Sequence, residues 1–217
     1  LTGFITPMGD NGGGKDYTIL ADHADITSVH AYKASNGLMT RTRKNQKTLW
    51  LYNTGMDRFS WGFYNWKVGS EGRWEWHFCW LEDGAKGGYP GREWFNPFTS
   101  MHGFTSYAPI SYPGGMLFTS RFLDVCEGIN DARYLHTLEN AIGRCAKAGI
   151  HADAVTAAKN LLAEIRKAIP EFPEAKGLEG EGSGALVGQG LETAARFQTP
   201  EWRRRIAALL VRMAVSE

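Results

Sequence analysis

Residues 47–80 are KTLWLYNTGMDRFSWGFYNWKVGSEGRWEWHFCW, and this stretch indicates the fold class of the chain. Its first part, 47–53, is rich in the β-branched and aromatic residues that favour strands. Asp57 is a good N-cap for a helix over 58–68, which two nearby glycines would end. Residues 73–80 then predict another strand. A strand, a helix and a strand of these lengths indicate a βαβ unit with parallel strands.

The same alternation extends toward the N-terminus. Strands are predicted at 3–7 and 24–32, with helical stretches at 17–22 and 35–45. Four such units make half of an eight-stranded barrel, and half a barrel leaves two unpaired edges and an uncovered interior. We therefore predict an α/β fold, the C-terminal portion of a (β/α)8 TIM-type barrel, for residues 1–120. We also expect a missing N-terminal barrel half or a partner chain to complete it, with further sequence upstream of the first residue.

Residues 121–217 predict an α-helical tail. The pattern before the tail lapses over 81–115 into a long loop of Gly, Pro and aromatic residues, which is the length of loop that usually has a function. Apolar spacing predicts helices over 124–148 and 155–169, and a third that starts with Thr199 as its cap. A Gly-rich loop is expected at 171–198. The predicted buried stripes are Val125, Ile129, Ala132, Leu135, Leu138, Ile142 and Cys145 in the first helix, and Trp202, Ile206, Leu209 and Met213 in the last.

Composition excludes several partners. The 217 residues carry 24 Lys and Arg against 23 Asp and Glu, a net charge of +1 that offers no electrostatic footprint for nucleic acid or an anionic membrane. No apolar run reaches the roughly 18 residues of a membrane span. The three cysteines are widely separated and lack zinc spacing, so we expect them to be small core residues. Aromatic residues make up 12% of the chain, and six of the eight tryptophans lie between residues 50 and 80.

Three motifs have a functional and a plainer interpretation. Gly9 to Lys15 fits a phosphate-loop pattern, but Asp16 replaces the Ser or Thr that would hold magnesium, so a glycine-rich loop is favoured. The run at 203–205 is three arginines on one helical turn, for which a solvated face is favoured over RNA binding. The histidines show no ligand spacing, so no metal site and no cofactor are predicted; those considered are His23, His30 and His77.

The carboxyl ends of the predicted strands carry the best candidate site, because parallel barrels collect functional side chains there. Flat aromatic faces with a few amide and hydroxyl groups suit a sugar, whose C–H face stacks on a ring. The alternative is that most of these aromatic residues are core, as the alternation of Trp74, Trp76, Phe78 and Trp80 indicates. The predicted substrate-binding residues are Tyr32, Asn53, Trp80, His30 and Tyr52.

Glycoside hydrolysis normally needs two carboxyl groups that flank the bond. Glu75 is the one carboxylate between residues 57 and 93 that lies inside a predicted strand, beside His77 on the same face. Burial in a barrel strand requires that Glu75 be paired or protonated, so it is a weak catalytic candidate and a structural ion pair is favoured. The residues thus predict a sugar site without a convincing acid–base pair.

Several segments follow one another in the order known from one protein family. They are KTLWLY (47–52), GFYNWK (62–67), WHFCW (76–80), YPG (112–114), TSR (119–121) and EGINDARYL (127–135). Together they resemble the C-terminal region of glycoside hydrolase family 123-like proteins, catalogued also as family 4091 of domains of unknown function, over roughly residues 25–140. The last segment is the most specific and is similar to the family pattern R-[DE]-G-I-[ED]-D-x-x-Y-L. Cys126 replaces the usual Arg and Leu123 a usual acidic residue, which affects an ion pair that ties this helix down in the family.

The resemblance implies a (β/α)8 barrel hydrolase of secreted or periplasmic location that acts on N-acetylhexosamine glycosides. Members work by substrate assistance, with an Asp that orients the acetamido group and a neighbouring Glu as the general acid. This chain contains no Asp-Glu dipeptide, so we expect that pair upstream and expect this chain alone to be inactive. The alternatives are a noncatalytic carbohydrate-binding protein and a purely structural domain.

Overall fold

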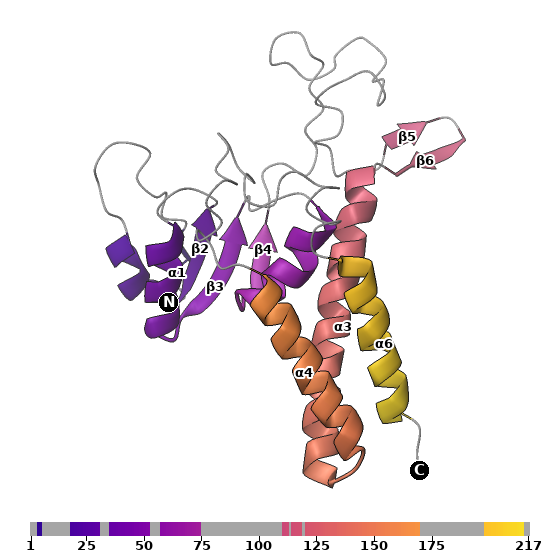
Figure 1. Ribbon diagram of the computed structural model, residues 1–217. Helices are drawn as coiled ribbons and strands as arrows, with labels where there is room; N and C mark the ends of the chain where they lie inside the picture. The colour runs from indigo at the N-terminus through magenta and orange to yellow at the C-terminus, as the bar shows by residue number, and fades with distance from the viewer. Residues whose placement is uncertain are drawn as a thin grey trace.

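The computed structural model describes residues 4–5, 18–30, 35–52, 57–74, 110–112, 114–118, 120–169 and 198–214. A small parallel sheet lies at one end of a bundle of three long helices (Figure 1).

The sheet contains four parallel strands in the order in which they occur along the chain. Helical segments connect consecutive strands, as the sequence predicts for successive βα units. Within the described part of the chain the sheet is open, and the eight-stranded barrel stays a prediction. The strands are β1 (Phe4–Ile5), β2 (Ile26–His30), β3 (Thr48–Tyr52) and β4 (Gly72–Trp74), and the first two connections contain η1 (Thr18–Asp22) and α1 (Ser35–Lys44).

The two faces of the sheet differ because successive strand residues point to opposite sides. Val29 and Leu51 are paired in register and are each 1% exposed, in one core with residues of α1. Trp50 and Tyr52 alternate with the buried leucines and are only partly buried. One face therefore packs on helices, and the other carries the aromatic side chains of β3.

The predicted helix over 58–68 is present and irregular. It begins α-helical at Arg58 and Phe59, widens into η2 (Ser60–Tyr64), a π-helical segment, and continues as α2 (Asn65–Lys67). We term residues 58–67 together the η2–α2 helix. The predicted cap is confirmed, since the Ser60 amide donates to Asp57 Oδ1 at 2.9 Å and the Ser60 hydroxyl donates to the Asp57 carbonyl at 2.9 Å. Gly69, at φ +69°, closes the helix in the left-handed region that glycine adopts without strain.

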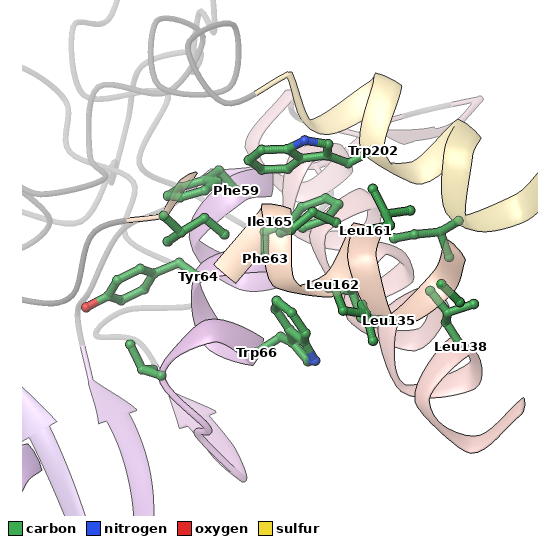
Figure 2. Packing of buried hydrophobic residues seen from close by; sticks show 14 of the residues in the cluster. Phe59, Phe63, Tyr64, Trp66, Leu135, Leu138, Leu161, Leu162, Ile165 and Trp202 are labelled. Carbon is green, nitrogen blue, oxygen red and sulfur yellow. The ribbon is translucent and has the colours of Figure 1, made fainter. Parts of the chain in front are cut away.

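Three long helices follow: α3 (Ser120–Ala148), α4 (Ala152–Ala168) and α6 (Thr199–Ala214). All three were predicted, although α3 begins four residues earlier than its apolar periodicity indicates. Their shared core contains Leu135, Leu138, Leu161, Leu162 and Ile165 and continues into the η2–α2 helix through Phe63 and Trp66 (Figure 2). The stripe predicted for α6 is confirmed, because Trp202, Ile206, Leu209 and Met213 are all buried.

Three expectations were wrong. Ile129 is 37% exposed, because the neighbouring Gly128 rather than Ile129 faces the η2 segment. Thr199 is not the cap of α6: its hydroxyl is buried without a hydrogen-bond partner, and the Gln198 carbonyl accepts the Glu201 and Trp202 amides instead. The loop assigned to 81–115 contains at its end the first strand of an antiparallel hairpin, β5 (Ile110–Tyr112) with β6 (Gly115–Leu117).

Candidate functional site

The carboxyl ends of three neighbouring strands bring the backbones of His30, Tyr52 and Trp74 into register, and the side chains of Tyr52 and Trp74 share the face of the sheet away from the helices. The rings of Tyr52 and Trp74 are stacked, with centroids 3.9 Å apart and planes 15° from parallel. The Trp74 indole N–H donates to the Ser28 hydroxyl at 2.7 Å, which fixes the orientation of the indole. The result is a preorganised aromatic surface whose indole is held from beneath by the buried Ser28 hydroxyl.

Trp50 extends this aromatic surface along β3. Its Cα is paired with that of Gly72, and a side chain at residue 72 would collide with the Trp50 indole. Glycine at this position of β4 therefore lets the indole lie across the neighbouring strand. Trp50, Tyr52 and Trp74 together define what we term the aromatic sheet face.

The structure brings together part of the predicted site. Tyr52 lies on the aromatic sheet face, and the backbone of His30 lies beside it. The other predicted residues, Tyr32, Asn53 and Trp80, and the weak catalytic candidate Glu75 lie outside the described residues. Sequence reasoning assigned Trp74 to packing and did not select Ser28; the in-register alignment of parallel strands is the signal that identifies them.

Asp57 is a buried carboxyl group with a raised pKa. It follows the carboxyl end of β3 by five positions and is 3% exposed, and while Oδ1 accepts the Ser60 amide, Oδ2 has no hydrogen-bond partner. Burial raises the pKa of Asp57 to about 7, and Asp124 raises it further, against the opposing effects of the Ser60 amide, Arg73 and the Phe59 amide. The sequence indicated only that this residue caps a helix.

Residues 127–135 have a structural role. Asp131 is fully buried and accepts two hydrogen bonds from Arg58, at 2.6 and 3.0 Å, and another from Arg203. Arg203 also pairs with Glu127. Asp131 thus links α3 to the start of the η2–α2 helix and to α6.

The solvated face predicted for the arginine run of α6 is confirmed for Arg204, whose side chain is 76% exposed, and is wrong for Arg203. Arg203 is only 22% exposed in its side chain because it pairs with the buried Asp131. Arg204 and Arg205 lie further out and pair with Glu201 and Glu164. Each arginine of the run therefore has a carboxylate partner within the protein.

Neither a membrane span nor a metal site is found in the described residues. None of the helices there is long and apolar enough to cross a bilayer, and no three His, Cys, Asp or Glu side chains there converge as metal ligands. The phosphate-loop-like residues 9–15 lie outside the described ranges.

Comparisons of the chain with protein families, with curated proteins and with solved structures found no match.

Proposed function

We propose that this chain is the carbohydrate-binding, C-terminal part of a glycoside hydrolase-like barrel protein. The stack of Tyr52 on Trp74 carries the proposal, because it places flat rings at the carboxyl ends of parallel strands. Rings held in this way are suited to the C–H face of a pyranose. The Ser28 hydroxyl accepts the indole N–H of Trp74 and so fixes this ring of the aromatic sheet face. Other polar groups would then hydrogen-bond to the sugar hydroxyls.

The resemblance of residues 25–140 to family 123-like hydrolases supports an N-acetylhexosamine as the ligand. Because the chain has no Asp-Glu dipeptide, we assign it sugar binding and assign the acid–base pair to another part of the complete protein. The same aromatic sheet face would serve a noncatalytic carbohydrate-binding protein, so binding and hydrolysis need separate experiments.

Tryptophan fluorescence measures binding directly. We expect saturable changes on titration with N-acetylgalactosamine or N-acetylglucosamine, and none with sorbitol. Tyr52→Ala should raise Kd about three- to tenfold, since an aromatic stack contributes about 0.5–1.5 kcal/mol. Tyr52→Phe is the matched control, because it keeps the ring and should bind within about twofold of the wild type. The absence of saturable binding, or equal affinity in the Ala variant, contradicts the proposal.

Hydrolysis is tested with chromogenic aryl N-acetylhexosaminides and the purified 217-residue chain. We expect no turnover above background, because substrate-assisted cleavage requires the missing pair. Turnover that Glu75→Gln abolishes would overturn the assignment of the acid–base pair to another part of the protein.

A further inference from the structure

Asp57 sits where the sheet and the helices join. It lies between the carboxyl end of β3 and the first turn of the η2–α2 helix, and its carboxyl group is buried although only one of its oxygens is used. Oδ1 accepts the Ser60 amide, and in return the Ser60 hydroxyl interacts with the Asp57 backbone. An ionised carboxylate inside a protein needs several donors, and a neutral carboxyl needs fewer.

The charged groups that face Asp57 from the neighbouring elements do not compensate for this burial. Arg73 of β4 attracts the carboxylate, but its guanidinium donates to the Ser60 carbonyl at 2.6 Å and lies 4.5 Å from the centre of the Trp61 ring. Asp124 of α3 repels the carboxylate. On its own helix the nearest cation, Arg58, is committed to Asp131.

We propose that Asp57 is a proton-binding site that acts as a pH-sensitive latch on the first turn of the η2–α2 helix. With the proton bound, the neutral carboxyl group caps the helix and fits its buried position. When the proton leaves, the Ser60 and Phe59 amides offset the charge only in part, Oδ2 has no hydrogen-bond partner, and the buried charge favours opening of this turn toward water. Since the turn also carries Arg58, opening strains the link to Asp131 and so loosens the contact between the end of β3 and α3.

The sign of the pH dependence follows from proton linkage. Burial raises the pKa of Asp57 from 3.8 to about 7, so between these values the folded state holds a proton that the unfolded state has released. The contribution of Asp57 to stability is therefore complete below pH 3.8 and is lost as pH rises to about 7. Within this window the unfolding equilibrium constant should rise by up to about tenfold per pH unit.

Urea unfolding of the wild type and Asp57→Asn between pH 5 and 8 tests the latch. Asparagine still caps the helix but does not ionise. We expect the unfolding constant of the wild type, relative to that of the variant, to rise on the order of 50-fold from pH 5 to 7. Parallel pH profiles for the two proteins would overturn the proposal.

Asp22→Asn is the matched control. Asp22 is also an aspartate, but hydrogen bonding to Arg41 lowers its pKa to about 2. The contribution of Asp22 to stability is lost only as pH falls below 3.8. Asp22→Asn should therefore leave the pH dependence of the unfolding constant between pH 5 and 8 unchanged.

A direct titration keeps the proposal testable if Asp57→Asn folds poorly. Carboxyl-carbon NMR of the wild type should show Asp57 titrating near pH 7, and hydrogen-exchange protection of the Ser60 amide should fall at least tenfold between pH 5 and 8 while that of Leu135 in α3 changes less. Asp57→Ser, which keeps a capping hydroxyl and removes the acid, should abolish the pH dependence of Ser60 protection. Titration of Asp57 below pH 5, or constant protection at Ser60 in the wild type, would refute the latch.

Discussion

Gly62 and Gly128 meet where the η2 segment crosses α3. A Cβ atom at residue 62 would lie 2.8 Å from the Asp131 Cβ and 2.8 Å from the Gly128 carbonyl oxygen. A Cβ atom at residue 128 would lie 2.6 Å from the Arg58 carbonyl oxygen and 2.6 Å from the Trp61 Cβ. The two backbones therefore approach to a distance that only glycine permits.

Gly128→Ala should destabilise the protein by about 1–3 kcal/mol, because the collision is with backbone that cannot move alone. The control is Gly143→Ala in the same helix, where nothing lies within 4 Å of an added Cβ. That change should instead stabilise by about 0.5–1 kcal/mol through helix propensity. Urea denaturation measures both, and equal effects would contradict the close crossing.

Asp131 is a buried carboxylate that pairs with Arg58 and Arg203. Asp131→Asn leaves Arg58 and Arg203 partly buried beside an uncharged amide, so a loss of about 3–5 kcal/mol is expected. Glu201→Gln, which breaks the exposed pair with Arg204, should cost less than about 1 kcal/mol. Thermal unfolding of the two variants separates a buried link from a surface pair; a small loss in Asp131→Asn would show that the link is dispensable.

At the scale of elements, the start of α6 differs from what its sequence predicts, because Thr199 is not the cap of the helix. A capping threonine replaced by an isosteric valine loses about 1 kcal/mol. Because the Thr199 hydroxyl is buried without a partner, Thr199→Val should instead stabilise by about 1 kcal/mol. Chemical denaturation gives the sign of the change in the free energy of unfolding. A destabilised Thr199→Val variant would indicate that the Thr199 hydroxyl does cap α6.

The helices were predictable to within a few residues because their signals are local. Asp57 with Ser60, and Gly149 at φ +71°, begin or end helices through contacts within one turn. The β5–β6 hairpin was missed because each strand has only three residues, too few to show a period. The π-helical form of η2 was also missed, since it depends on packing against α3.

At the scale of the whole molecule, one core joins the sheet to the bundle. Phe63 packs on Trp202 with ring centroids 5.1 Å apart (Figure 2). Further along the same helix, the Trp66 indole N–H donates to Glu139 at 3.0 Å, and the Arg166 guanidinium lies 4.0 Å from the centre of the Trp66 ring. The η2–α2 helix therefore connects β3 and β4 to α3, α4 and α6.

Trp202→Ala should therefore destabilise the sheet and the whole helical bundle, and not α6 alone. A loss of about 3–5 kcal/mol is expected from the cavity, and backbone and aromatic circular dichroism should still report one transition, because sheet and bundle share the core. Val211→Ala, at a position 63% exposed, should change stability by less than about 0.5 kcal/mol. Separate transitions would divide the molecule into independent units.

Residue patterns alone were sufficient for the long helices, the parallel direction of the strands and the aromatic character of β3, because period and turn chemistry act between neighbours. Three features depended on folding: the partner set of Asp131, the raised pKa of Asp57 and the stack of Tyr52 on Trp74. Arg58 and Asp131 are 73 positions apart, and the pKa of Asp57 depends on how much water the surrounding helices exclude. Such properties arise when distant segments meet and remove a charge or a ring from solvent, which no local pattern records.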